Sequence, residues 1–298
     1  MVVMFGIGVL AALVGLAATS DWKSLLGLSL AGFWFLVAGL VLYRREKQQV
    51  DGHWWGRILV AGLLVRLPAA FLHLAVAFWF YRGETDFLEY HRAGGTMVQQ
   101  WLEGKVDSVS DSLLPLWGFI YVHVTPAKTE LRLMEHLTGL SNFLVGPGLV
   151  GMVILFALVG FIGCYLFLRA FRLEFPYGKD TRFLALGLFF LPSLAFWGSY
   201  PGKDAWMLLF LGCVSYSFSS LLKRFHVGHL LGIVASLMGI ALLRGPLAGI
   251  LVLTMGASWL LKRWKGPAAI LRPTTFIVYP FAVVVVFMYI GSSLLPGS

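Results

Sequence analysis

Three groups of charged residues interrupt the long apolar stretches of this sequence, and their residue types are suited to chemistry. Glu84 and Asp86 place two carboxylates two positions apart. Lys203 is followed directly by Asp204, and Arg244 stands between two apolar runs. A carboxylate can accept a proton from an attacking hydroxyl, and lysine and arginine bind phosphate groups. The three groups together predict proton transfer beside a bound phosphate.

The acidic group has a structural explanation as well as two chemical ones. Asp86 can act as a general base, and Glu84 with Asp86 can hold a divalent cation such as Mg²⁺ or Mn²⁺. Asp86 followed by Glu89 is also a capping-box pattern, which would only start a helix. Apolar residues then recur at near-helical spacing, which predicts an amphipathic helix on the membrane surface. They are Phe87, Tyr90, Met97, Trp101 and Leu102.

The basic groups are open to the same two kinds of explanation. Lys203 is predicted to contact a phosphate, with Asp204 orienting it or capping the next helix, whereas an ordinary solvated turn needs neither role. Arg244 precedes Gly245-Pro246 in a tight hairpin, so it is predicted to lie near the head-group level. There it is either a bidentate phosphate ligand or an arginine that snorkels toward water.

Arg66 and His73 differ from the other candidates because they fall inside an apolar stretch. A charge in the middle of a bilayer is costly, so such residues usually face a cavity or a partner. His73 follows seven residues after Arg66, on about the same helix face. The two residues are predicted to line a polar cleft that opens toward Glu84; the alternative is a structural ion pair or a span boundary that lies elsewhere.

The apolar stretches that carry these residues predict a membrane protein. The chain is 59% hydrophobic and 12% charged, and that charged fraction is about half of the usual value for a soluble domain. A helix needs about 20 apolar residues to cross the hydrocarbon layer. We predict an all-α polytopic membrane helix bundle with about nine transmembrane helices and amphipathic helices in one long outer loop, 81–142. The predicted spans are 3–18, 25–43, 58–80, 143–168, 183–199, 205–222, 230–243, 247–261 and 276–295.

The charge distribution predicts which side of the membrane each loop occupies. Loops after the even-numbered spans carry 14 basic residues and four acids, whereas the other side carries eight basic residues and ten acids. Because cytoplasmic loops are enriched in lysine and arginine, the N-terminus is predicted inside and the C-terminus outside. The net charge of +9 is explained by these loops, so nucleic acid is not expected as a partner. Membrane lipid is the expected partner.

Several common catalytic motifs are not found in the sequence. There is no Walker motif, no zincin His-Glu-x-x-His and no Gly-x-Ser-x-Gly elbow. Cys164 and Cys213 lie inside apolar runs and are interpreted as small buried residues. ATP-driven transport and hydrolysis by these motifs are therefore disfavoured.

In their order along the chain, the charged groups resemble the motifs of the GT-C superfamily of polytopic glycosyltransferases, especially its bacterial protein-mannosyltransferase-like branch. Glu84-Thr85-Asp86 resembles the Asp-x-Asp or Glu-x-Asp motif of the first large outer loop. The run 86–91, Asp-Phe-Leu-Glu-Tyr-His, is similar to its tyrosine-containing continuation. The stretch 192–204 is similar to a Pro-Ser…Phe-Trp-Ser…Lys-Asp/Glu stretch, and Arg244 is similar to an outer arginine after it. The resemblance covers about residues 57–260.

The resemblance implies transfer of a sugar from a polyprenyl-phosphate donor to an acceptor on the extracytoplasmic side of a bacterial inner membrane. Asp86 would be the base, and Glu84 would orient it or bind a metal. The implied substrate-binding residues are Lys203, Asp204, Arg244, Arg66, His73, Tyr90 and His91. The chain then divides into two N-terminal helices with a basic loop (1–56), a GT-C-like core (57–261) and a basic loop with a last helix (262–298).

Two other functions are compatible with the same residues. A transporter or flippase of a lipid-linked or anionic solute would use Arg66 and Arg244 as charges along the substrate path. A non-catalytic membrane subunit would use its outer segment to bind a membrane-protein partner. It would tolerate substitution of Asp86, Lys203 and Arg244.

Overall fold

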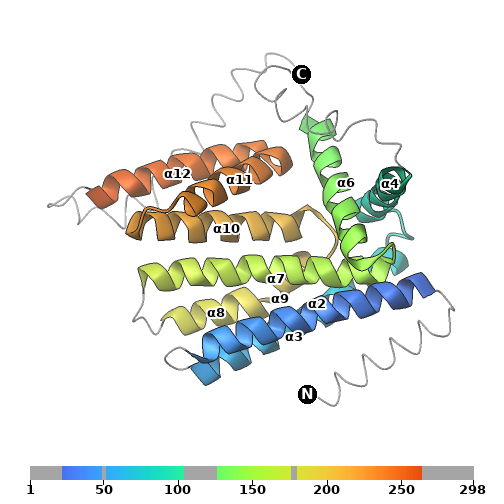
Figure 1. Ribbon diagram of the computed structural model, residues 1–298, viewed down its shortest axis with the longest axis horizontal. Coiled ribbons are helices and arrows are strands. Elements are labelled where there is room, and N and C mark those ends of the chain that lie inside the picture. Colours follow the sequence, from blue (N-terminus) through green and yellow to red (C-terminus); the bar gives the residue numbers. More distant parts are fainter. Residues whose placement is uncertain (1–21, 49–51, 104–125, 176–179, 264–298) are drawn as a thin grey trace.

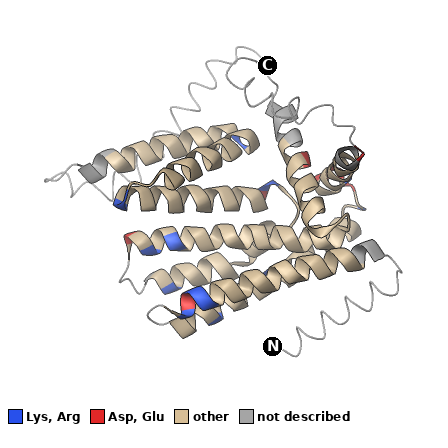
Figure 2. Cartoon of the chain, in the orientation of Figure 1, with Lys and Arg blue, Asp and Glu red and all other residues tan. Residues whose placement is uncertain are grey.

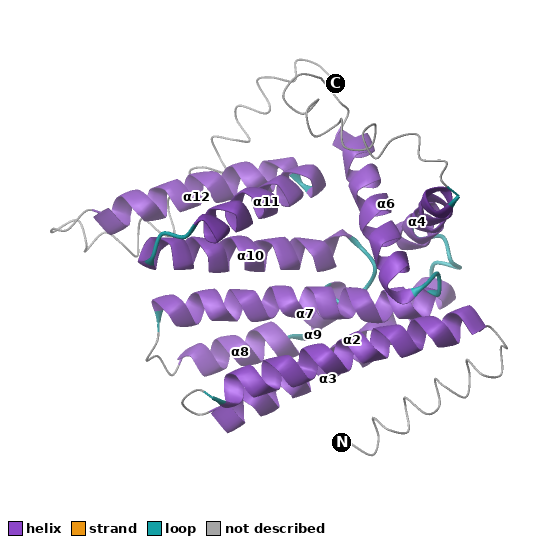
Figure 3. Cartoon of the chain, viewed as in Figure 1, coloured by secondary structure: helices purple, strands orange, loops and turns teal. Residues whose placement is uncertain are grey.

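The computed structural model describes residues 22–48, 52–103, 126–175 and 180–263. Within these ranges the chain is helical, with connecting turns and without strands (Figure 3). The all-α prediction is confirmed for this part of the chain. The helices are α2 (Trp22–Lys47), α3 (Gly52–Trp79), α4 (Asp86–Leu102), α6 (Pro126–Val145), α7 (Leu149–Glu174), α8 (Asp180–Phe190), α9 (Pro192–Trp197), α10 (Lys203–Lys223), α11 (Val227–Leu243) and α12 (Gly245–Arg263).

Four of these helices have the length and apolar composition to cross a bilayer. They are Leu25–Lys47, Gly52–Trp79, Leu149–Glu174 and Lys203–Lys223. This identifies the chain as an integral membrane protein. Three further apolar helices are shorter, at Thr181–Phe190, Val227–Leu243 and Gly245–Trp259. The count of nine spans is not confirmed, and the predicted spans 3–18 and 276–295 lie outside the described residues.

Two predicted spans are divided or shortened by proline and glycine. The predicted span 183–199 is broken at Leu191, where the backbone is extended, and Pro192 begins the separate helix α9. Proline has no N–H to donate and its ring clashes with the preceding turn, so it interrupts a continuous helix. The predicted span 143–168 begins later, at Leu149, because Gly146 has a φ of +79° and Pro147 follows it.

The long helices alternate in direction (Figure 1), so the two ends of the bundle differ in the residues they carry. We call one end the basic end; it holds the last turns of α2, α7 and α10, where Lys and Arg gather (Figure 2). At the other end, which we call the α4/α6 end, helices α4 and α6 lie across the ends of the long helices (Figure 1). Helix α4 buries Phe87 and Tyr90 and exposes Glu89, as an amphipathic helix should.

Helix α7 lies at the centre of the bundle and contacts α2, α3, α6, α8 and α10. Every residue of 151–161 is buried. A Cβ atom built on Gly212 of α10 would lie 2.1 Å from the carbonyl oxygen of Gly163 in α7, so only glycine permits this approach. Small residues that let backbones approach closely are the usual basis of helix packing in membranes. The α7–α10 pair is therefore fixed by shape.

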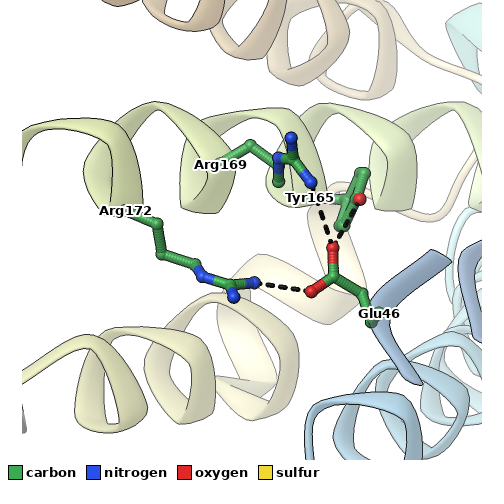
Figure 4. A network of polar contacts seen from close by, with 4 residues as sticks. All are labelled: Glu46, Tyr165, Arg169 and Arg172. Atoms are coloured by element: carbon green, nitrogen blue, oxygen red, sulfur yellow. Dashed lines mark hydrogen bonds and ion pairs between the residues drawn. The ribbon is translucent and has the colours of Figure 1, made fainter. Parts of the chain in front are cut away.

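A buried ionic network fastens α2 to α7 at the basic end (Figure 4). Glu46 has no solvent exposure. Its Oε1 accepts hydrogen bonds from the Tyr165 hydroxyl at 2.8 Å and from Arg169 Nη1 at 3.3 Å. Its Oε2 accepts from Arg172 Nη1 at 2.6 Å. The Arg172 guanidinium also lies 4.4 Å from the ring centroid of Trp55, which extends the network to α3.

Loss of the Glu46 charge is expected to destabilise the bundle. Glu46→Gln leaves two guanidinium groups beside a neutral amide, and removing one partner of a buried ion pair costs about 3–5 kcal/mol. Thermal unfolding in detergent should show a clearly lower melting temperature. Glu174→Gln is the matched control, since Glu174 is an exposed acid at the same end of the bundle. Equal melting of Glu46→Gln and the wild type would contradict a stabilising network.

Candidate functional site

Tyr200 is held in the turn between α9 and α10, at the α4/α6 end. The ring of His73 from α3 stacks on it, with centroids 4.0 Å apart and planes inclined by 17°. Phe87 of α4 approaches its edge, with centroids 6.4 Å apart. A Cβ atom on Gly202 would lie 2.1 Å from the Tyr200 ring, so only glycine lets the chain fold back beneath it. Two helices that are separate in the sequence, together with the glycine of its own turn, therefore fix this side chain.

Charged residues from separate elements act electrostatically on the Tyr200 hydroxyl. Burial, followed by the negative charges of Asp204 and Asp86 and by Tyr90, raises the pKa of Tyr200 to about 12, and Arg244 acts in the opposite direction. These effects require the groups to lie within electrostatic range of one another. We call this set, Asp86, Tyr90, Tyr200, Asp204 and Arg244, the Tyr200 cluster. It contains one residue from each of the three predicted charged groups: Asp86, Asp204 and Arg244.

Asp204 and Arg244 form the one direct ion pair that the structure gives within the Tyr200 cluster. Arg244 Nη2 donates to Asp204 Oδ1 at 3.1 Å. Both side chains remain partly exposed, at 52% for Arg244 and 33% for Asp204. The bond engages one of the five N–H donors of the guanidinium. Asp204 thus orients Arg244, and this bond does not engage the other N–H donors of the guanidinium.

The acidic group lies at the start of α4. The helix begins at Asp86, which makes Thr85 the preceding residue, whereas the capping-box interpretation had placed Asp86 before the helix. Asp86 is exposed, and Glu84 is exposed in the turn that leads to it. Within the described chain, no three His, Cys, Asp or Glu side chains gather as a metal site. Two carboxylates such as Glu84 and Asp86 would leave most coordination positions of Mg²⁺ to water or to phosphate oxygens.

The remaining predicted residues lie around this cluster. Lys203 is half-buried and is the first residue of α10, next to Asp204. Tyr90 is buried, and its carbonyl oxygen accepts a hydrogen bond from Thr138 of α6 at 2.8 Å. His91 is half-buried, and burial together with the charge of Arg92 lowers its pKa, so its imidazole is neutral at pH 7.

Arg66 is enclosed between α3, α7 and α9 and has no solvent exposure. Its Nη1 donates to the Leu194 carbonyl at 3.3 Å and to the Ser199 hydroxyl at 3.4 Å. Its Nη2 donates to the Cys164 sulfur at 3.0 Å. All three acceptors are uncharged, so this is neither the predicted structural ion pair nor contact with an open cleft. Arg66 instead holds the end of α9 against the bundle.

Several of these residues were not identified from the sequence. Tyr200 stood among other aromatic residues without a charge to mark it, although it follows Ser199 in a proline- and glycine-rich turn. Cys164 was interpreted as a small buried residue, and its sulfur accepts a hydrogen bond from a guanidinium. No pattern in the sequence indicates that pairing, because its partner is 98 positions away.

Comparison with known proteins identifies no relative. The sequence matches no protein-family model and none of the curated proteins, and no solved structure matches the fold. The function is therefore argued from the arrangement of the described residues.

Substitution of Arg66 is expected to loosen the bundle. Lysine carries a single ammonium group and cannot reproduce the planar fork that reaches Leu194, Ser199 and Cys164. We expect Arg66→Lys to cost about 3 kcal/mol and to lower the melting temperature in detergent. Arg57→Lys is the control, because Arg57 is exposed on the same helix. If both variants melt like the wild type, Arg66 does not anchor α9.

The difference between the alkaline titrations of the wild type and Tyr200→Phe is expected to report the pKa of Tyr200. Its pKa of about 12 lies above the unperturbed value of 10.0, so the folded state favours the protonated hydroxyl. This contribution to stability is fully present below about pH 10 and is lost as the pH rises through about 12. The difference in tyrosinate absorbance between wild type and Tyr200→Phe should therefore emerge near pH 12. A difference centred near pH 10 would contradict the described environment.

Proposed function

We propose that this chain is a membrane-embedded glycosyltransferase that moves a sugar from a polyprenyl-phosphate donor to an acceptor hydroxyl. The proposal places the reaction on the extracytoplasmic side of a bacterial inner membrane, with the basic end of the bundle facing the cytoplasm. The observation that carries it is the Tyr200 cluster. Residues of the types needed for proton transfer and for phosphate binding come together there from four separate elements.

The chemistry requires a base beside a phosphate-binding group. Asp86 accepts the proton from the acceptor hydroxyl. The acceptor oxygen then bonds to the anomeric carbon, the bond from that carbon to the phosphate oxygen breaks, and the electron pair leaves with the polyprenyl phosphate. Arg244 and Lys203 stabilise the negative charge on this leaving group. A divalent cation on Glu84 and Asp86, if bound, would supply further charge neutralisation for the phosphate.

The electrostatics of the cluster are suited to these roles. Asp86 is exposed, so its carboxylate can meet an acceptor that arrives from water. The Tyr200 hydroxyl stays protonated at physiological pH and can donate a hydrogen bond to a phosphate oxygen. Asp204 holds Arg244 in place without using its whole donor set. The bound phosphate would then share the guanidinium with Asp204.

The two alternative functions make different demands on the same residues. A transporter needs Arg66 on a path accessible to substrate, and Arg66 is enclosed with three uncharged acceptors. This favours a structural role for Arg66. A non-catalytic subunit would retain its function when the Tyr200 cluster is altered. Substitution of Asp86 therefore separates that alternative from the enzyme.

Asp86→Asn is expected to abolish transfer while preserving the fold. The amide has the shape of the carboxylate but cannot accept the proton, and loss of general-base catalysis costs about 10²–10⁴-fold in rate. Membranes containing the protein would be incubated with a radiolabelled polyprenyl-phosphate hexose, and release of polyprenyl phosphate measured. Glu89→Gln is the matched control, an exposed acid in the first turn of the same helix.

The outcome decides between the enzyme and the subunit. Loss of transfer in Asp86→Asn with normal transfer in Glu89→Gln would support Asp86 as the base. Unchanged transfer in Asp86→Asn would exclude that role. Wild-type membranes that release no polyprenyl phosphate from any lipid-linked hexose would overturn the proposed function itself.

A further inference from the structure

Helices α4 and α6 are in close contact, and polar groups are buried between them. The Thr138 hydroxyl of α6 bonds to the Tyr90 carbonyl of α4 at 2.8 Å. One turn along α4, a Cβ atom on Gly94 would lie 2.5 Å from the same Thr138 hydroxyl oxygen. The two backbones therefore approach closely, and the side chains that follow on the same faces are brought together.

Asn142 lies one turn beyond Thr138 on α6 and is 3% exposed. Within the described part of the chain, neither its amide nitrogen nor its carbonyl oxygen has a hydrogen-bond partner. Gly95 of α4 faces the amide across the helix contact, where a Cβ atom would lie at ordinary van der Waals distance, 3.9 Å, from Asn142 Nδ2. Leaving a buried polar group unsatisfied is costly, and Asn142 leaves both a donor and an acceptor. A single group that donates one hydrogen bond and accepts another would satisfy both atoms.

His91 presents a second such group to the same region. It precedes Gly95 by four residues, so the two positions are neighbours on one face of α4. Its Nδ1 is buried and has no hydrogen-bond partner among the residues that the structure describes. Burial and the adjacent Arg92 lower the pKa of the imidazole, which is therefore uncharged at pH 7, and Arg92 itself is exposed. The polar side chains described at this contact, Thr138, Asn142 and His91, are thus all neutral.

We propose that Asn142 and His91 form a binding site for a hydroxylated, uncharged group, of which a sugar ring is the chemical type. A sugar hydroxyl donates one hydrogen bond and accepts another, which matches the paired donor and acceptor of an asparagine amide. A phosphate or carboxylate cannot donate to the amide oxygen. A hydrocarbon chain would leave both polar atoms unsatisfied.

The position of the site connects it with the Tyr200 cluster. Tyr90 belongs to that cluster, and its carbonyl is bonded to Thr138, one turn from Asn142. Gly95, opposite Asn142, follows Asp86 by nine residues on α4, so a sugar at Asn142 would lie along α4 about 13 Å from Asp86. That this sugar belongs to the acceptor of the transfer rests on the proposed function; the binding site itself rests on the unsatisfied groups.

Binding is tested by thermal unfolding in phosphatidylcholine nanodiscs, with methyl mannoside and methyl glucoside as probes. We expect each effective glycoside to raise the melting temperature of the wild type by about 2–4 °C at saturating concentration. Asn142→Leu should lose this shift. Its melting temperature without sugar should equal or exceed that of the wild type, because an apolar side chain of similar size removes two unsatisfied polar atoms.

Ser141→Ala is the matched control, because Ser141 is also buried but its hydroxyl is already bonded to the Leu137 carbonyl at 2.7 Å. It should keep the glycoside shift. If Asn142→Leu fails to fold, NMR of the wild-type protein with ¹⁵N-labelled asparagine side chains tests the site. The Asn142 amide signal should shift on addition of glycoside. The absence of any glycoside response in the wild type, or an equal response in Asn142→Leu, would overturn the site and assign the amide to buried water.

The two proposals fail in different ways. Glycoside binding is read without transfer, so Asp86→Asn should keep the thermal shift even when it loses activity. If the shift depends on Asn142 while no lipid-linked sugar is consumed, the binding site stands and the transferase does not. If transfer occurs and Asn142→Leu transfers sugar normally, with the wild-type glycoside shift, the transferase stands and the Asn142 site does not.

Discussion

Close backbone contact along α7 is the constraint on which the rest of the structure depends. In a lipid bilayer, apolar side chains gain little free energy when they exchange lipid contacts for protein contacts. Helices therefore associate through complementary shape and polar contacts. Glycine supplies the shape: Gly151 lies against α2, and Gly163 against α10. Gly160 meets the carbonyl of Gly198, at the end of α9. With α7 fixed against these neighbours, the ends of the helices have defined positions, and so do the residues they carry.

Two buried charges act at different depths on this glycine-packed frame. Glu46 joins α2 to α7 at the basic end, and Arg66 holds the end of α9. Their hydrogen-bond partners differ in kind. The Glu46 carboxylate accepts from cationic and phenolic donors, whereas the Arg66 guanidinium donates to a carbonyl, a hydroxyl and a sulfur. Neither charge contacts the Tyr200 cluster directly. The bundle thus separates the residues that hold helices together from those exposed at the α4/α6 end.

The sequence predicts the helices better than it predicts their contacts. Apolar runs and their flanking charges predict that α2, α3, α7 and α10 are long apolar helices, although α7 begins later than predicted, because helix length and side-chain polarity are local properties. The role of Pro192 was not predicted: hydropathy counts side chains, whereas proline acts on the backbone. Asp86 and Arg244 were identified by charge, but Glu46 was counted as a loop acid. Its burial depends on arginines more than 120 positions away.

The helix break before Pro192 lies between the middle of the bundle and the turn that carries Tyr200. Arg66 binds the carbonyl of Leu194 and the hydroxyl of Ser199, and only Tyr200, Pro201 and Gly202 separate Ser199 from the first turn of α10. Such a short, tethered connection has almost no slack. A single inserted or deleted residue here would rotate Lys203 and Asp204 by about 100° around the α10 axis. The length of this turn is therefore as strict a requirement as the identity of its side chains.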